Sequence, residues 1–278
     1  MTDKYAVFGN PIAHSKSPDI HRQFAEQTAQ DLTYDKQLVA EGAFDQAAQD
    51  FFAGGGKGLN ITVPFKLDAY SYAAKLTSRA RRAGAVNTLA LQDDGSIIGD
   101  NTDGSGMVND IVTHQAWAVK GKRVLILGAG GAVRGVLQPL LEQQPAQIVI
   151  ANRTAEKAQQ LATGFIELGE LKGCGYPDLE AIKGGGFDLV INGTSASLSG
   201  ELPPLPSGIL SEGACCYDMM YSAEPTVFLT WAKSQGAQGL ADGLGMLVGQ
   251  AAEAFQLWRG QMPDVQPVIK NLRDLLNK

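Results

Sequence analysis

Residues 124–127 (Val-Leu-Ile-Leu) are continuously apolar and run directly into a glycine-rich loop, and this segment constrains the fold more than any other. A strand without polar side chains on either face is typical of a parallel sheet that helices cover on both sides. A stretch with helical periodicity begins immediately after the loop, at Ala132. The segment therefore predicts a strand–turn–helix unit of an α/β fold, and the remaining chain must supply the neighbouring strands.

The same alternation of short apolar runs and amphipathic stretches extends through most of the chain. In the first part, the expected strands are residues 5–9, 34–39, 59–63 and 87–91, and the expected helices are residues 20–30, 43–53 and 67–76. In the second part, the expected strands are residues 123–127, 147–151, 187–191 and 216–219, and the expected helices are residues 132–143, 155–168, 246–260 and 265–276. Such alternation predicts a mostly parallel sheet in each part.

This order of elements predicts two α/β domains flanking a cleft, the second of them Rossmann-like. With 278 residues, the chain is long enough for two hydrophobic cores. We expect residues 104–240 to form the dinucleotide-binding domain as an insertion. Residues 1–103 and 241–278 are then expected to form the substrate-binding and catalytic domain.

Composition narrows the class of protein. Hydrophobic residues make up 44% and charged residues 19%, which excludes a disordered chain. A net charge of −6, from 23 basic and 29 acidic residues, argues against nucleic acid as a partner. No apolar window of about 18 residues occurs, and the first 11 residues hold no long apolar run. We therefore expect no membrane span and a cytoplasmic location.

Cysteines and histidines give no sign of a metal site. The three cysteines form neither a CxxC pair nor a zinc spacing with histidine, so we expect free thiols and no bound metal. His14, His21 and His114 are not spaced as metal ligands either, and we expect them to be structural.

The glycines of the loop at residues 128–131 suit a dinucleotide. Gly128 allows a tight turn, Gly130 lets the backbone approach a pyrophosphate, and the following helix offers free N–H groups. Val133 stands where the general G-x-G-x-x-G pattern has its third glycine, so the match is incomplete. The alternative is a tight strand-to-helix turn without a ligand.

The segment after the next expected strand favours NADP over NAD. An NAD site usually has Asp or Glu about 20 residues after the glycine loop. This chain has Asn152, Arg153 and Thr154 there, with Lys157 beyond. Arg153 can hold a 2′-phosphate with two hydrogen bonds, and Thr154 and Lys157 can add donors. The alternative is a solvated helix start with Thr154 as its N-cap.

Two hydroxyls follow the first expected strand. Ser15 and Ser17 are two residues apart, so in an extended loop both can face one carboxylate. Ser17 also precedes Pro18, which is the pattern of a helix N-cap with proline at the first helical position. The two interpretations are compatible.

A lysine follows the third expected strand. Asn60 and Thr62 share one face of that strand, and Lys66 comes at its carboxyl end, where α/β sites are built. Asp103, in an Asn-Thr-Asp-Gly turn, can orient this lysine, and Asn87 adds a polar group for a hydroxylated ligand. A lysine held by a carboxylate can donate the proton that carbonyl reduction needs. The alternative is a solvated surface lysine.

In order along the chain, these segments resemble the bacterial shikimate dehydrogenases of the biosynthetic type. The matching motifs are Gly9-Asn-Pro-Ile-x-His-Ser-x-Ser-Pro18, Asn60-x-Thr-x-Pro-x-Lys66, Ala83-Gly-Ala-Val-Asn-Thr88, Gly99-x-Asn-Thr-Asp-Gly104, Gly128-Ala-Gly-Gly-Ala132, Asn152-Arg-Thr154, Tyr217-Asp-Met-x-Tyr221 and Ala241-Asp-Gly-x-Gly-Met-Leu-x-x-Gln250. Two positions depart from the family pattern. Gly193 replaces the alanine of an Asn-Ala-Thr-Ser stretch, and Ser78 stands at a position that contacts the cofactor in some members.

The resemblance implies a role for each matching residue. Lys66 is the catalytic lysine, paired with Asp103, and Ser15 and Ser17 bind the carboxylate of shikimate. The other substrate-binding residues are Thr62, Asn87, Asp103, Gln250 and Tyr221. The NADP-binding residues are Gly128, Ala129, Gly130, Gly131, Ala132, Asn152, Arg153, Thr154, Lys157, Met219 and Gly243.

The expected function is thus the NADPH-dependent, reversible reduction of 3-dehydroshikimate to shikimate in chorismate and aromatic amino-acid biosynthesis. The expected partners are the small-molecule substrate and NADP, with no nucleic acid and no membrane, in a monomer or homodimer. One alternative is a related dehydrogenase acting on quinate or an amino-shikimate. Another is a non-catalytic NADPH-binding module, against which the intact Lys66 and Asp103 argue.

Overall fold

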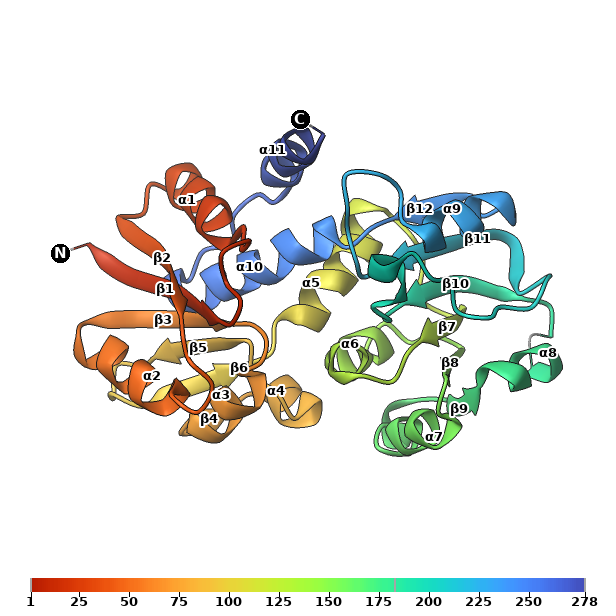
Figure 1. Ribbon diagram of the computed structural model, residues 1–278, viewed down its shortest axis with the longest axis horizontal. Coiled ribbons are helices and arrows are strands. Elements are labelled where there is room, and N and C mark those ends of the chain that lie inside the picture. Colours follow the sequence, from red (N-terminus) through yellow and green to blue (C-terminus); the bar gives the residue numbers. More distant parts are fainter. Residues whose placement is uncertain (1, 183, 278) are drawn as a thin grey trace. The chain divides into compact units, whose positions relative to one another are not determined.

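The computed structural model describes residues 2–182 and 184–277, which form two compact units (Figure 1). The first unit contains the chain up to Gly106 together with Val248–Val268, and the second contains Met107–Leu247 and the residues from Ile269 onward. The two-domain α/β fold predicted from the sequence is confirmed. The boundaries differ from those expected, since helix α5 (Asp103–Asn109) and helix α10 (Leu244–Arg259) each contain one of them.

The last helix, α11 (Gln266–Leu276), also lies differently from the expectation that all of 241–278 joins the first unit. Arg273 in this helix donates hydrogen bonds to the Ser222 carbonyl at 3.0 Å and to Asp242 Oδ1 at 2.5 Å. Both partners belong to the second unit, so these bonds attach the end of the chain to it.

The first unit has a six-stranded sheet in the order β2-β1-β3-β5-β6-β4. Its strands are β1 (Asp3–Gly9), β2 (Leu32–Leu38), β3 (Gly56–Ile61), β4 (Lys75–Leu76), β5 (Thr88–Leu91) and β6 (Ile97–Asp100). Strands β2, β1 and β3 are mutually parallel, whereas β5 runs antiparallel to both β3 and β6. The sheet is therefore mixed, and the β5–β6 hairpin departs from the parallel pairing expected.

Helices cover both faces of this sheet (Figure 1). They are α1 (Ser17–Thr28), α2 (Phe44–Ala53), α3 (Lys66–Tyr72), α4 (Ser78–Ala83) and the part of α10 from Val248 onward. Alternate side chains of β1 point to opposite faces. Ala6 and Phe8 join a core with Phe44 of α2, while the ring of Tyr5 lies 4.7 Å from that of Trp258 in α10.

The pairing of the strands brings four chain segments to one edge of the sheet. Strands β1 and β3 are parallel, so both end at this edge. Because β5 is antiparallel to β3, it begins there, and Thr88 pairs with Asn60. Strand β6 in turn ends there, with Asp100 opposite Thr88. The loops after β1, β3 and β6 and the residue before β5 are therefore neighbours.

The second unit has a fully parallel sheet in the order β12-β11-β10-β7-β8-β9. Its strands are β7 (Arg123–Leu127), β8 (Gln147–Asn152), β9 (Leu171–Gly175), β10 (Phe187–Asn192), β11 (Leu210–Asp218) and β12 (Gly239–Ala241). Its helices are α6 (Gly131–Leu141), α7 (Ala155–Thr163), α8 (Leu179–Ile182) and α9 (Val227–Ser234), with a π-helical turn Asp110–His114 and short 3-10 turns Ile166–Leu168, Tyr176–Asp178 and Ala196–Ser199. If β7 to β12 are numbered 1 to 6 and the sheet is read from β9 to β12, the strand order is 3-2-1-4-5-6. This is the arrangement of the dinucleotide-binding fold.

Strand β7 has both faces buried, as its apolar run predicts. Val124 and Ile126 lie in a core with Val136 of α6, and Leu125 and Leu127 lie in a second core with residues of α8 and α9. Two expected helices are shorter than predicted. The stretch 67–76 ends as α3 at Tyr72 and continues into β4, and the stretch 155–168 leaves the α-helix at Thr163, just before Gly164.

Candidate active site

Lys66 and Asp103 form an ion pair at the shared edge of the first sheet. Lys66 is the first residue of α3, just beyond β3, and Asp103 is the first residue of α5, just beyond β6. Lys66 Nζ lies 2.5 Å from Asp103 Oδ2. The side chains are 31% and 14% exposed, so the pair is accessible to a ligand while its geometry is held by the protein. The two residues predicted to form a proton-transfer pair are thus in contact.

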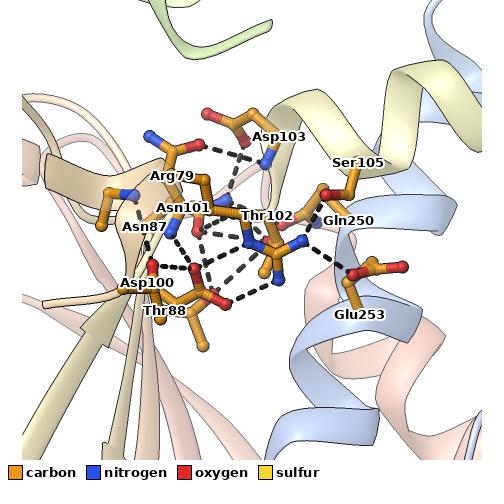
Figure 2. A network of polar contacts seen from close by, with 12 residues as sticks. Arg79, Asn87, Thr88, Asp100, Asn101, Thr102, Asp103, Ser105, Gln250 and Glu253 are labelled. Atoms are coloured by element: carbon orange, nitrogen blue, oxygen red, sulfur yellow. Dashed lines mark hydrogen bonds and ion pairs between the residues drawn. The ribbon is translucent and has the colours of Figure 1, made fainter. Parts of the chain in front are cut away.

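Asn87 connects this pair to Gln250 (Figure 2). Its Nδ2 donates to Asp103 Oδ1 at 2.8 Å and to Gln250 Oε1 at 3.4 Å. Its Oδ1 accepts from the Thr102 backbone N–H at 2.9 Å, which fixes the orientation of the amide. Gln250 reaches the site because α10 approaches α5 closely, and a Cβ on Gly106 would lie 2.3 Å from the Gln250 nitrogen.

Ser15 and Ser17 are also close together, in the segment that follows β1. Ser15 Oγ donates to Ser17 Oγ at 3.2 Å and accepts from the Ser17 backbone N–H at 3.3 Å. The prediction that Ser17 is a helix N-cap is wrong. Ser17 is the first residue of α1, Lys16 occupies the N-cap position, and within the described residues no side chain caps this helix.

Thr62 lies beside the loop that leads to these serines. A Cβ on Gly9 would lie 2.5 Å from Thr62 Cγ2, so glycine is what permits the close approach. The Asn10 backbone N–H also donates to the Val63 carbonyl at 3.0 Å. The loops after β1 and β3 are therefore packed together.

A chain of hydrogen bonds leads from the core of the first unit to Asn87, which contacts Asp103. Most of this chain was not predicted. His21 Nε2 and the Tyr34 hydroxyl both contact Asn60 Oδ1, at 3.1 and 2.7 Å. Asn60 Nδ2 donates to Thr88 Oγ1 at 3.1 Å, and Thr88 Oγ1 donates to Asn87 Oδ1 at 2.9 Å. The available signal was a polar residue inside an apolar strand, which Asn60 and Thr88 both provide.

In the second unit, the glycine loop lies where the order of the strands reverses, between β7 and β10. Gly128 has a φ of +103°, a backbone conformation that favours glycine. Around Gly130 and Gly131, apart from the neighbouring residues in the chain and the backbone of the same helix, no described atom lies within 4 Å of where a Cβ would stand. Gly130 is the N-cap of α6, and no side chain of the described residues caps that helix. Gly130, Gly131 and Ala132 are exposed, so the N-terminus of α6 is accessible to a pyrophosphate.

Val133, which stands at the third position of the glycine pattern, packs against Gly193. Its side chain is fully buried, and its Cγ2 lies 2.4 Å from the position that a Cβ on Gly193 would take. Gly193 in turn donates its N–H to the Leu127 carbonyl at 2.8 Å. The space that a side chain at position 193 would need is therefore occupied by Val133.

The segment after β8 presents cations and a hydroxyl to solvent. Asn152 Nδ2 donates to the Thr154 carbonyl at 2.9 Å and so shapes the turn. Arg153, Thr154 and Lys157 are exposed. Thr154 stands at the N-cap position of α7, but within the described chain its side chain makes no capping hydrogen bond. This arrangement suits a 2′-phosphate, because donors are accessible and no carboxylate ends β8.

Met219, Tyr221 and Gly243 gather beyond β11 in the same unit. The Met219 backbone N–H donates to the Asn192 carbonyl at 2.9 Å. A Cβ on Gly243 would lie 2.1 Å from the Met219 carbonyl oxygen, so the two loops touch through glycine. Tyr221 is partly buried, and burial raises the pKa of its hydroxyl above the ordinary value. It belongs to the second unit, whereas the other residues expected to bind substrate belong to the first.

Other features of the described residues bear on the expectations. No group of three or more His, Cys, Asp or Glu side chains among them is arranged to hold a metal ion. None of the helices they form is long and apolar enough to cross a membrane. The three cysteines are free, and burial raises the pKa of Cys174 to about 11 and that of Cys216 to about 12. Such thiols are unreactive near neutral pH.

Known proteins match this chain over nearly its whole length. Residues 7–89 match the family model of the shikimate dehydrogenase substrate binding domain, residues 110–199 that of shikimate/quinate 5-dehydrogenase, and residues 243–273 that of the shikimate 5′-dehydrogenase C-terminal domain. Shikimate dehydrogenase (NADP(+)) of Cellvibrio japonicus is 66% identical over 278 residues, covering 100% of this chain and 99% of the relative.

Solved structures share the fold. An Ael1 enzyme from Pseudomonas putida has a TM-score of 0.92 and 45% identity, covering 98% of both chains. Shikimate 5-dehydrogenase from Thermus thermophilus, in complex with NADP(H) and shikimate, has a TM-score of 0.85 and 31% identity, covering 99% of this chain and 100% of the other.

Taken together, fold and site define a class: an α/β oxidoreductase that works with a dinucleotide. The matched models and the identity to full-length relatives narrow this class, and the chain belongs to the shikimate dehydrogenase family. Its cofactor is NADP, as it is in the named relatives. The family, enzyme class and cofactor predicted from the sequence are confirmed.

Proposed function

We propose that this protein interconverts 3-dehydroshikimate and shikimate with NADP(H), and that Lys66 and Asp103 carry the proton. The observation that supports this most is the 2.5 Å contact of Lys66 Nζ with Asp103 Oδ2, beside Asn87 and Gln250. A charged pair that is partly exposed among amide groups matches the needs of carbonyl reduction on a hydroxylated ring. The reaction would serve the biosynthesis of chorismate and aromatic amino acids, as the family implies.

The residues of the second unit fit the cofactor. Gly128–Ala132 leave the N-terminus of α6 open for the pyrophosphate, while Met219 and Gly243 line the adjacent loops. Arg153 and Lys157 would hold the 2′-phosphate, with Asn152 and Thr154 shaping the turn. NADPH supplies the hydride when it is bound.

Lys66 would manage the proton that accompanies this hydride. Carbonyl reduction leaves negative charge on the oxygen, and the Lys66 ammonium can donate a proton to that atom. In the reverse direction, neutral Lys66 accepts the proton of the substrate hydroxyl. Asp103 keeps Nζ in place through Oδ2, while its Oδ1 is held by Asn87. Asp103 therefore orients the lysine through a charge-assisted hydrogen bond.

The remaining side chains would fix the ring. Ser15 and Ser17 lie 3.2 Å apart through their hydroxyl oxygens, so both can donate to one carboxylate of the substrate. Thr62, Asn87 and Gln250 would bind ring hydroxyls, and Tyr221 is a further proposed substrate contact. Each of these residues matches a position of the family motifs. The cytoplasmic location and the monomeric or homodimeric state stay predictions.

A panel of substrates and cofactors tests the proposal. Purified protein is incubated with shikimate or quinate and with NADP+ or NAD+, and the absorbance of the reduced nicotinamide is followed. We expect shikimate with NADP+ to give the highest kcat/KM of the four combinations. A higher kcat/KM with quinate, or no turnover with either substrate, would contradict the proposed substrate.

A further inference from the structure

The Arg79 side chain joins three segments near Asp103 (Figure 2). Its Nε and Nη2 donate to the two carboxylate oxygens of Asp100, at 2.8 and 2.6 Å. Its Nη1 donates to Ser105 Oγ and, at 3.1 Å, to Glu253 Oε2. One planar group thus ties together the end of β6, the first turn of α5 and the middle of α10.

Asp103 lies between two of these attachment points. Asp100 precedes it by three residues and Ser105 follows it by two, so Arg79 holds both ends of the turn that carries the carboxylate. Asp100 is further fixed by the Thr77 hydroxyl at 2.5 Å and by the Asn101 backbone N–H at 2.8 Å. The turn cannot shift as a whole without breaking these bonds.

The ion pair of Arg79 with Asp100 is favourable although the Asp100 carboxylate is buried. Burial raises the pKa of the Asp100 carboxyl, but the hydrogen bonds and positive charge of Arg79 outweigh it and leave the pKa below its usual value. The Arg79 side chain is 26% exposed and that of Asp100 only 3%. A carboxylate this deeply buried needs its partner, because an uncompensated charge in such a place is costly.

The third residue that Arg79 holds, Glu253, lies in the same helix as Gln250. Glu253 follows Gln250 by three residues in α10, so the two side chains share one side of the helix. Gln250 Oε1 accepts a hydrogen bond from Asn87, which also donates to Asp103. By holding Glu253, Arg79 therefore fixes the helix face that supplies Gln250 relative to the turn that supplies Asp103.

We propose that Arg79 is a positioning residue for the reaction: it fixes Asp103 against Lys66 and sets the spacing between Asp103 and Gln250. This inference rests on the proposed roles of Lys66, Asp103 and Gln250. Arg79 acts through Asp100, Ser105 and Glu253. The shape of the guanidinium is essential, since a planar fork can serve three acceptors in fixed directions, whereas the lysine ammonium is a point charge on a flexible stem.

The first test compares Arg79→Lys and Arg79→Ala with wild type in steady-state kinetics. A displacement of about 1 Å at a catalytic group costs on the order of 100-fold in rate, so we expect kcat to fall roughly 10- to 100-fold in both variants. The KM for shikimate should rise as well, because Asp103 and Gln250 both bind substrate. The KM for NADP+ should stay within about twofold, since its proposed ligands lie in the other unit. Arg22→Ala, which removes an exposed arginine paired with Glu26, is the matched control and should behave as wild type.

The second test is rescue. Millimolar guanidinium added to Arg79→Ala should restore part of kcat, and it should leave Arg22→Ala unchanged. Should Arg79→Ala fail to fold, the double variant Ser105→Ala/Glu253→Ala removes two of the three attachments and should show the same pattern with Asp100 still paired. Wild-type kcat in either set of folded variants would overturn the proposal. Full activity in Arg79→Lys would overturn the role proposed for the shape of the guanidinium, because a positive charge would then be sufficient.

These outcomes are distinct from failure of the proposed function. Wild-type protein that does not oxidise shikimate would refute the function before any variant is made. Active wild type with unaffected Arg79 variants would refute only the positioning role. An equal loss of shikimate and NADP+ affinity would also overturn it, because general damage to the fold explains that result.

Discussion

Replacing His21 should change how the stability of this protein depends on pH. His21 is 1% exposed and stacks on the Tyr34 ring at 4.2 Å, with Phe24 and Trp258 also against it. Its Nε2 contacts Asn60 Oδ1, which accepts, so Nε2 carries the proton. Among the described residues, Nδ1 has no hydrogen-bond partner. A second proton on the ring would therefore bring a charge with no acceptor into an apolar site.

The size of the effect follows from the pKa. Burial lowers the pKa of His21 from 6.5 to about 3, against the smaller opposing effect of the Asn60 hydrogen bond. Below pH 6.5 the unfolded chain binds a proton that the folded protein does not, so stability falls as the pH falls. Each pH unit is worth about 1.4 kcal/mol once the unfolded histidine is fully protonated. Between pH 7 and pH 5, His21 should therefore cost the folded state about 2 kcal/mol.

Urea unfolding of wild type and His21→Gln, followed by tryptophan fluorescence, measures this cost. Glutamine keeps a donor for Asn60 Oδ1 but does not titrate. The difference in free energy of unfolding between the two proteins should shift by about 2 kcal/mol in favour of the variant from pH 7 to pH 5. His14→Gln, at an exposed position, controls for the loss of a histidine. Parallel pH curves for wild type and His21→Gln would refute the reasoning.

Two further predictions concern the second unit. Arg153→Ala should weaken NADPH binding by about 1–3 kcal/mol, roughly 5- to 150-fold in Kd, and leave NADH binding nearly unchanged, because only NADPH carries the 2′-phosphate. Fluorescence titration with both cofactors measures this. Equal losses of affinity for NADPH and NADH would mean that Arg153 acts by stacking on the adenine ring or through folding, and not through the 2′-phosphate. Gly193→Ala should destabilise by about 1–3 kcal/mol, because the new Cβ would lie 2.4 Å from Val133 Cγ2, and adding Val133→Ala should remove most of that cost. Additive losses in a thermal-unfolding double-mutant cycle would refute the coupling.

Much of the fold could be predicted because local patterns carry it. The apolar run of β7 and the glycines after it define a buried strand and a turn within a few residues. The β5–β6 hairpin was missed, since the direction of β5 depends on its pairing with β3, about 30 residues earlier. Strand β9 was missed because Lys172 and Gly173 interrupt its apolar residues.

The residues of the site also differ in whether the local sequence could predict them. Lys66 and Asp103 could be predicted from residue type and from their places near strand ends, and the structure brings them into contact. The residues behind them could not, because their partners are distant in sequence. Arg79 meets Glu253 across 174 positions, and His21 meets Asn60 across 39. Nothing near Arg79 in the chain distinguishes it from Arg81 and Arg82, which follow it.

Lys66 is the group proposed to move the proton, and its replacement tests this role directly. Lys66→Ala should bind shikimate and NADP+ nearly as wild type does by equilibrium titration, while its single-turnover rate falls by at least about 100-fold. Lys57→Ala, at the opposite end of β3 from Lys66, provides the control and should keep the wild-type rate. A Lys66→Ala rate within about threefold of wild type would place the proton donor elsewhere and contradict the central claim.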